Sequence, residues 1–149
     1  MSMIEDVRRR SPWILHFDTG SCNGCDLEIW ASLSPRYDIE RFGAIDEGNP
    51  KHADIFLLTG PVTKKTEDRL RNLYLQTPEP KLVVAIGDCA SNGAPFLKCY
   101  NVNYGIDKII PVDVYVPGCA ARPEAVMDGL LLAISIWKER LEKREGGND

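Results

Sequence analysis

Short apolar segments recur along this chain and alternate with longer segments in which apolar and polar residues are mixed. Ile55–Thr59 and Leu82–Ile86 are nearly continuous apolar runs, a pattern typical of parallel strands that are buried on both faces. Residues 13–17 and 112–116 are also predicted as strands, and residues 37–42 are a weaker strand candidate.

The mixed segments are predicted as helices. Residues 66–76 place Leu70 and Leu73 on one helical face, and residues 26–33 and 122–143 have helical character as well. Because strands and helices alternate along the chain, the expected fold is α/β, with one open parallel sheet and helices on both of its faces.

Length and composition fit a single domain over residues 1–149. A chain of 149 residues with 44% hydrophobic and 27% charged residues is long enough to build its own core. Residues 1–12 are predicted as an N-terminal extension and residues 144–149 as a tail. Residues 91–110 have little periodicity and are predicted as a long functional loop.

Charge and hydropathy exclude several classes of partner and location. The net charge of −4 gives no sequence-wide basic surface for nucleic acid. The first ten residues contain no apolar core of a secretory signal, so we expect the chain in the cytoplasm with its thiols reduced. The apolar run at 130–137 is far too short to cross a bilayer, so no transmembrane segment is expected.

Four of the five cysteines follow predicted strands. Cys22 and Cys25 form a close pair after the first strand, and Cys89 and Cys119 follow two later strands. Sites in open α/β sheets form beyond the carboxyl ends of the strands, so these four thiols are expected to meet there. Cys99 lacks such a setting and is expected to be a packed or partly buried thiol.

Four thiolates and several neighbouring glycines favour an iron-sulfur cluster. Glycines such as Gly24, Gly87 and Gly118 let backbone amides approach cluster sulfurs, and hydrogen bonds to those sulfurs tune the reduction potential. Two other interpretations remain open from the residues alone. Cys-x-x-Cys between a strand and a helix also occurs in thioredoxin-type redox pairs, and four cysteines also form structural zinc sites.

Three motifs carry a resemblance to a known family. Residues 20–28 read GSCNGCDLE, residues 87–90 read GDCA, and residues 111–119 read PVDVYVPGC. Together they resemble the family that unites the small subunits of nickel-iron hydrogenases with the subunit of respiratory complex I that holds cluster N2. The similarity extends from about residue 13 to residue 137.

The resemblance implies a flavodoxin-like domain that holds one 4Fe-4S cluster through Cys22, Cys25, Cys89 and Cys119. It further implies that the chain passes electrons within an oxidoreductase and has no complete active site of its own. The implied partners are a large catalytic subunit, a ferredoxin-like subunit with two clusters, and integral membrane subunits that translocate ions. The chain would then lie peripherally on the cytoplasmic face of the membrane.

The spacing of the two cysteines in the first motif distinguishes the branches of this family. Complex I subunits place their first two cysteines side by side, whereas hydrogenase small subunits separate them by two residues, as in Cys22 and Cys25. The chain is also shorter than the small subunits of uptake hydrogenases. Both features favour the energy-converting, membrane-bound hydrogenases. Membrane-bound sulfur-reducing or quinone-reducing relatives are the alternative.

One departure from the family pattern follows the last cysteine. Relatives usually have two prolines there, whereas this chain has Ala120 and Ala121 before Arg122. Prolines restrict the turn after a ligand, so their absence is expected to loosen the turn or to alter the contact with a partner. Arg122 is a candidate interface or tuning residue.

Several charged residues near the cysteines are candidates for tuning. Asp26, Glu28 and Asp88 would put negative charge close to a cluster, which lowers its potential because reduction adds an electron. Ordinary helix-start acids are the alternative for Asp26. His16, inside the first strand, is expected to be a hydrogen-bonded structural residue. The run at residues 8–10 is expected to be solvated charge or a contact with a partner or the lipid surface.

Overall fold

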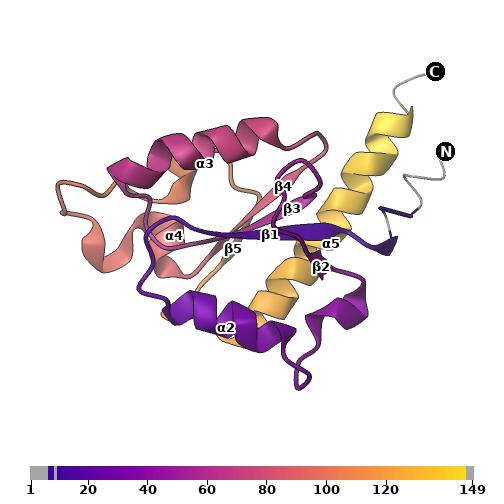
Figure 1. Cartoon of the computed structure of the whole chain (residues 1–149), viewed down its shortest axis with the longest axis horizontal. Helices are drawn as coiled ribbons and strands as arrows, with labels where there is room; N and C mark the ends of the chain where they lie inside the picture. Colours follow the sequence, from indigo (N-terminus) through magenta and orange to yellow (C-terminus); the bar gives the residue numbers. More distant parts are fainter. Residues whose placement is uncertain (1–6, 9, 147–149) are drawn as a thin grey trace.

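The computed structural model describes residues 7–8 and 10–146 and has one five-stranded parallel sheet (Figure 1). The strand order is β2-β1-β3-β4-β5, the flavodoxin-like order, so the predicted fold class is confirmed. The strands are β1 (Trp13–Asp18), β2 (Ile45–Asp46), β3 (Ile55–Thr59), β4 (Leu82–Ile86) and β5 (Val114–Val116).

Four of these strands end in a single row of the sheet. Asp18 at the end of β1 pairs with Thr59 at the end of β3, Thr59 pairs with Ile86 of β4, and Ile86 pairs with Val116 of β5. The loops that follow these strands therefore leave the sheet side by side at its carboxyl edge.

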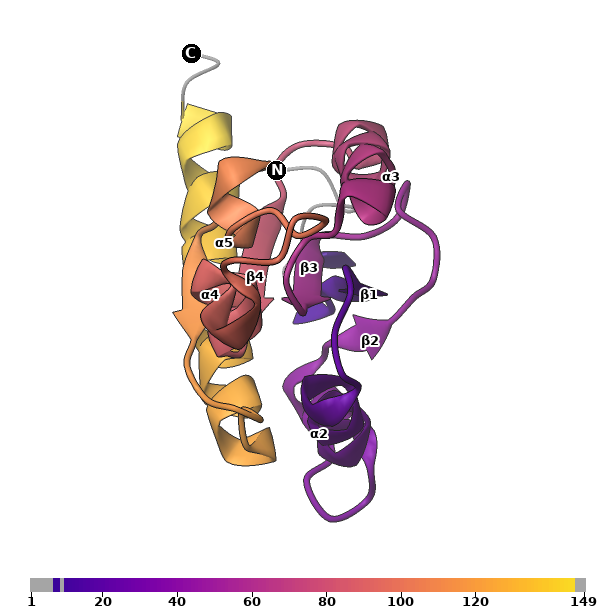
Figure 2. The same ribbon diagram turned by 90° about the vertical axis from the view of Figure 1, so that its left-hand side faces the viewer.

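Helices cover both faces of the sheet (Figure 2). Helices α2 (Gly24–Leu33) and α5 (Pro123–Gly146) pack on one face, against side chains that include Leu57 and Val84. Helices α3 (Lys64–Gln76) and α4 (Asp88–Asn92) pack on the other face, against side chains that include Phe56 and Val83. Since successive strand residues point to opposite faces, the continuous apolar runs supply both halves of the core.

The prediction of a strand at residues 37–42 was wrong. Ile39–Phe42 is a 3-10 helix, η1, bounded by Asp38 at φ 48° and Gly43 at φ 86°. These two left-handed residues turn the chain at both ends, so the buried Ile39 reaches the core from a helical turn and the edge strand β2 starts only at Ile45.

Some predicted boundaries also changed. The predicted loop at 91–110 includes the end of α4 and two 3-10 turns, η2 (Ala94–Phe96) and η3 (Ile106–Lys108). Helix α5 continues to Gly146, so the first part of the predicted tail is helical, and residues 147–149 lie outside the described residues. No helix in the described part of the chain is long and apolar enough to cross a membrane.

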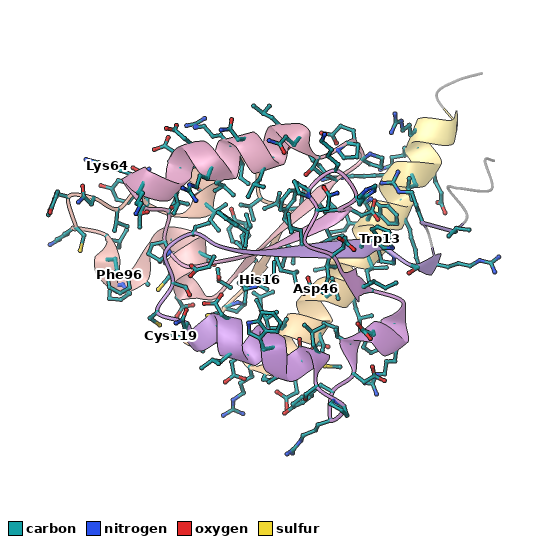
Figure 3. The ribbon with its side chains drawn as sticks, in the orientation of Figure 1. Trp13, His16, Asp46, Lys64, Phe96 and Cys119 are labelled. Carbon is teal, nitrogen blue, oxygen red and sulfur yellow. The ribbon has the colours of Figure 1, made fainter. Side chains whose placement is uncertain are left out.

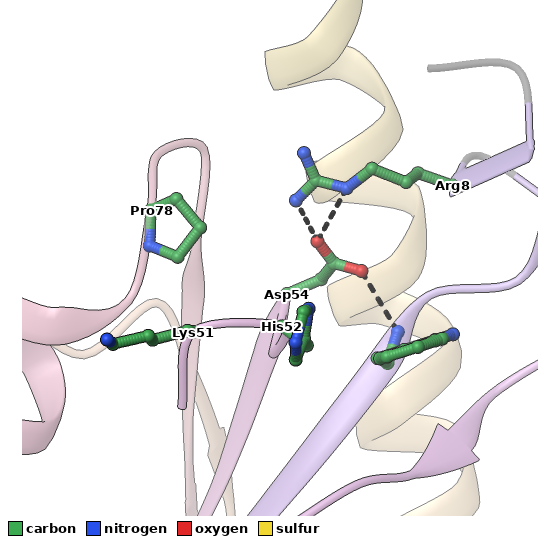
Figure 4. Close-up of a pocket in the computed structure, with 6 residues that line it drawn as sticks. Arg8, Lys51, His52, Asp54 and Pro78 are labelled. Atoms are coloured by element: carbon green, nitrogen blue, oxygen red, sulfur yellow. Dashed lines mark hydrogen bonds and ion pairs between the residues drawn. The ribbon is translucent and has the colours of Figure 1, made fainter. Parts of the chain in front are cut away.

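A partly buried ion pair lies at the opposite, amino edge of the sheet (Figure 4). The Asp54 carboxylate precedes β3 and accepts hydrogen bonds from the Arg8 guanidinium and, at 3.0 Å, from the Trp13 amide. Burial raises the pKa of Asp54, although these two donors oppose the rise. The prediction for residues 8–10 was wrong for Arg8, because its guanidinium pairs with Asp54 of the same chain. Arg9 lies outside the described residues.

The ion pair gives a pH-dependent prediction. Arg8→Met should lower the free energy of unfolding at neutral pH by about 3 kcal/mol, because a buried carboxylate loses its cation. The Asp54 pKa is already raised in the folded protein and should rise further, so the deficit should shrink as the pH falls and Asp54 takes up a proton. Denaturant unfolding at several pH values measures this. Arg69→Met, at an exposed position on α3, is the control, and equal losses in both variants would contradict the prediction.

Candidate functional site

The four cysteines that follow strands line one small cavity at the carboxyl edge of the sheet. Cys22 and Cys25 come from the β1–α2 connection, Cys89 from the start of α4, and Cys119 from the β5–α5 connection. Figure 3 shows Cys119 beside the first turn of α2. The structure therefore brings together cysteines that are up to 97 positions apart in the sequence (119 − 22 = 97).

The cavity opens at the protein surface. Cys22 and Cys119 are exposed, whereas Cys25 and Cys89 are partly buried. The sulfurs of the other three cysteines are close enough to Cys89 to affect its ionisation. The pKa of the Cys89 thiol is raised by burial first, and then by negative charge on Cys119, Cys22 and Cys25. Four thiolates at these positions therefore need compensating cations, which is the chemistry of a metal cluster.

Asp88 joins two of the cysteine loops. Its carboxylate accepts a hydrogen bond of 3.0 Å from the Gly118 amide, and its own amide donates one of 3.0 Å to the Gly118 carbonyl. Cys89 and Cys119 are the next residues along the chain on each side of this clamp. The Asp88 carboxylate, predicted as a tuning charge, thus holds the loops of Cys89 and Cys119 together.

Gly87 lets the sulfur of Cys25 approach the backbone. Its φ of 88° is in the left-handed region, and a Cβ added there would lie 2.6 Å from the Cys25 Sγ. Such a contact is closer than van der Waals packing allows, so any side chain at this position would push Cys25 away. The loop is therefore shaped to admit sulfur next to the main chain. The donor set and this space both fit a cluster held by thiolates.

Asp26 anchors the start of α2 beneath the cavity. Its buried carboxylate accepts hydrogen bonds from Ser21 Oγ, from Thr59 Oγ1 at 2.5 Å and from His16 Nε2 at 2.8 Å. Burial opposes its ionisation, but these hydrogen bonds and the charge of His16 outweigh burial and lower the pKa of Asp26. The prediction that His16 is a hydrogen-bonded structural residue is confirmed; Figure 3 shows it between β1 and α2.

Asp26 and its neighbours also act on Cys25. Burial raises the pKa of the Cys25 thiol, and the Asp26 carboxylate adds to the rise. The backbone amide of Ala121 donates a hydrogen bond to Cys25 and opposes both effects.

In the described part of the chain, no three His, Cys, Asp or Glu side chains close around a single metal ion.

Two other predicted candidates lie at the rim. Glu28 is half-buried on α2, three residues after Cys25, and Arg122 is exposed immediately before α5. Two exposed apolar side chains on α2 were not predicted, Leu27 at 67% exposure and Trp30 at 57%. They are exposed because Asp26, Ile29 and Ser32 occupy the buried face of the same helix.

Cys99 does not belong to this site. It lies outside the cavity and is exposed, so the prediction of a packed or partly buried thiol was wrong. The reason is local: its amide closes a turn onto the Phe96 carbonyl, in a stretch of exposed residues between η2 and η3. Thr59 is a further residue of the site that was not predicted. Its hydroxyl, at the end of β3, donates a hydrogen bond to Asp26.

A family model matches most of the chain. The profile of the family described as "NADH ubiquinone oxidoreductase, 20 Kd subunit" matches residues 22–133, which include all four cysteines of the cavity. This match covers well over half of the chain. The chain belongs to this family. The resemblance stated on the three cysteine motifs is therefore confirmed, and the chain is a member of an oxidoreductase subunit family.

Individual relatives are named as subunits of a hydrogenase and of a hydrogenlyase. The chain is 55% identical, over 125 residues, to a "Probable membrane-bound hydrogenase subunit mbhJ" of Pyrococcus furiosus, covering 84% of this chain and 75% of that protein. It is 40% identical to "Formate hydrogenlyase subunit 7" of Escherichia coli, covering 98% of this chain and 57% of that protein.

A solved structure shares the fold. A chain of the membrane-bound sulfane sulfur reductase, an archaeal respiratory membrane complex, has a TM-score of 0.79 and 40% sequence identity to this chain. The match covers 92% of this chain and 76% of the other. Similarity to both hydrogenase and sulfur reductase subunits agrees with the alternatives that the motifs left open.

The Asp88 clamp gives a prediction that needs no bound group. Asp88→Ala should lower the free energy of unfolding by about 1 to 3 kcal/mol, because the Gly118 amide loses a charged acceptor. It should also speed hydrogen exchange of that amide, which NMR measures residue by residue. Asp68→Ala, at an exposed position on α3, is the control. Unchanged exchange at Gly118 in Asp88→Ala would show that the clamp does not hold the loop.

Proposed function

We propose that this chain carries one 4Fe-4S cluster and relays electrons within a membrane-bound oxidoreductase complex. The proposed ligands are Cys22, Cys25, Cys89 and Cys119. The observation that carries the proposal is that these four cysteines, from three loops far apart in sequence, line one cavity at the carboxyl edge of the sheet. A 4Fe-4S cluster takes four cysteine thiolates and supplies a one-electron couple.

The surrounding residues have defined roles in this proposal. Asp88 holds the loops of Cys89 and Cys119 together, and Gly87 leaves room for the Cys25 sulfur. The Asp26 carboxylate keeps negative charge beside Cys25, which lowers the potential of a cluster because the reduced form carries one more negative charge. A low potential suits exchange of electrons with a ferredoxin-like donor and with protons.

The exposed side of the cavity supports transfer to another subunit. Cys22 and Cys119 are exposed, and Leu27 and Trp30 present apolar surface on the adjoining helix. Exposed apolar and aromatic side chains are typical of protein interfaces. We infer a large catalytic subunit as the acceptor, a ferredoxin-like two-cluster subunit as the donor, and integral membrane subunits that translocate ions. The chain would be peripheral, on the cytoplasmic face of the membrane.

Hydrogen chemistry is the proposed reaction of the complex. The 55% identity to a probable membrane-bound hydrogenase subunit supports proton reduction or hydrogen oxidation coupled to ion translocation. Sulfur or quinone reduction is the second candidate, supported by the likeness to a subunit chain of the membrane-bound sulfane sulfur reductase. The sequence of the large partner separates them, because two Cys-x-x-Cys pairs there would mean a nickel-iron centre.

Substitution of single cysteines tests the ligand set. Protein purified without oxygen should be brown, contain about four irons per chain and give an electron paramagnetic resonance signal once it is reduced. Cys89→Ser and Cys119→Ser should lose most of the iron and the signal. Cys99→Ser is a matched control and should keep both, because Cys99 lies outside the cavity.

Two results would overturn the cluster proposal. Colourless protein that contains zinc would indicate a zinc-stabilised binding module. Equal iron content in Cys99→Ser and Cys89→Ser would remove Cys89 from the ligand set.

Glu28→Gln tests the rim of the site. We expect this variant to keep its iron but to slow electron transfer in the assembled complex several-fold, because it removes a negative charge near Cys25 and the interface. Glu139→Gln, at an exposed position toward the far end of α5, is the control. Turnover equal to that of the unmodified complex would reject the role of Glu28.

A further inference from the structure

A second cavity, of about 260 Å³, lies at the amino edge of the sheet, opposite the edge that carries the four cysteines (Figure 4). Six residues from three segments of the chain line it: Arg8, Trp13, Lys51, His52, Asp54 and Pro78. A cavity of about 150 Å³ already holds a benzene ring, so this one has room for a ring and a charged group.

The Arg8 guanidinium is held in a fixed orientation beside this cavity. Its Nε and Nη2 both donate to Asp54 Oδ1, and its Cζ lies 5.7 Å from the centroid of the Trp137 ring. The Asp54 side chain is 2% exposed, whereas that of Arg8 is 29% exposed. The carboxylate therefore lies beneath the arginine and orients it, and the charge that reaches the solvent is the guanidinium, with its Nη1 outside the ion pair.

A tight turn brings two further donors to the cavity. Asn49 and Pro50 are typical of the first two positions of a β-turn. The His52 amide donates to the Asn49 carbonyl at 3.0 Å, and the Lys51 amide donates to Asn49 Oδ1 at 3.1 Å. Lys51 and His52 are both exposed. Within residues 7–8 and 10–146, the Lys51 ammonium forms no ion pair, so its charge is open to a ligand.

The other walls of the cavity are flat and largely apolar. The rings of Trp13 and His52 pack together with their centroids 5.6 Å apart and their planes at 60°. Figure 4 shows Pro78 and Lys51 on one side of the space and Arg8 and His52 on the other. Apolar and aromatic walls with a few polar groups are the usual composition of a small-molecule site.

We propose that this cavity binds a phosphate monoester of a small aromatic or heteroaromatic molecule. Arg8 Nη1, the Lys51 ammonium and a ring N–H of His52 are three separate donors, which suit the three terminal oxygens of a phosphate. A carboxylate would pair side-on with a guanidinium, but Asp54 already takes the Nε and Nη2 donors of Arg8. The ring of the ligand would pack against Trp13 and Pro78. The inference goes beyond the proposed function and does not depend on a cluster.

An NMR titration of the full chain with phenyl phosphate tests the inference. We expect the indole signal of Trp13 and the ring signals of His52 to shift, with a dissociation constant of about 1 mM or lower. Glycerol phosphate has the same charged group without the ring and should bind about tenfold more weakly, because it buries less apolar surface. Equal affinity for the two probes would overturn the inference, and so would the absence of phenyl phosphate binding.

Two variants test the donors. Lys51→Ala should weaken phenyl phosphate binding about tenfold, because a charged hydrogen bond to the phosphate is lost. Lys98→Ala, at an exposed position after η2, is the matched control and should bind like the unmodified chain. Lys51 is exposed, so its variant should unfold at the same denaturant concentration as the control. Equal binding in the two variants would overturn the inference, whereas the iron content of the same samples tests the proposed function separately.

Discussion

The parallel register of the sheet is the constraint on which the site depends. Asp18, Thr59, Ile86 and Val116 form one row across four strands, and each is the last residue of its strand. Cys22, Cys89 and Cys119 lie three or four residues beyond β1, β4 and β5 and must therefore meet at one edge. Cys25 follows Cys22 by three residues, at the start of α2. Because β3 and β4 are buried on both faces, a shift in this register would expose core side chains, so packing energy fixes where the sulfurs lie.

Polar contacts then convert this shared edge into a defined cavity. Asp88 binds the main chain of Gly118 and joins two loops, while Asp26 gathers donors from β1, β3 and the first cysteine loop. Both carboxylates lie next to a cysteine in the sequence, so they position it and also set its electrostatic surroundings. The Ala121 amide opposes the effect of Asp26 on Cys25. The electrostatics and the geometry of the cavity thus depend on the same few residues.

The fold and the four cysteines of the cavity could be predicted from the sequence for a physical reason. Ile55–Thr59 and Leu82–Ile86 are nearly continuous apolar runs. Such runs are typical of parallel strands buried on both faces, so they locate the carboxyl edge of the sheet. Residues 37–42 misled because Ile39 and Phe42 pack inward from a 3-10 turn as well as they would from a strand. The contacts of Asp88 with Gly118 and of Ala121 with Cys25 could not be predicted from the sequence, since both depend on the conformation of the backbone.

The central claim is that sulfurs from three loops hold one inorganic cluster at an exposed edge of this domain. Anomalous X-ray diffraction at the iron absorption edge, on crystals of the full chain grown without oxygen, tests it most directly. We expect one compact group of four iron atoms bonded to Cys22, Cys25, Cys89 and Cys119. A single metal ion bound there, or iron that leaves Cys89 or Cys119 turned away from the Cys22 and Cys25 corner, would contradict it.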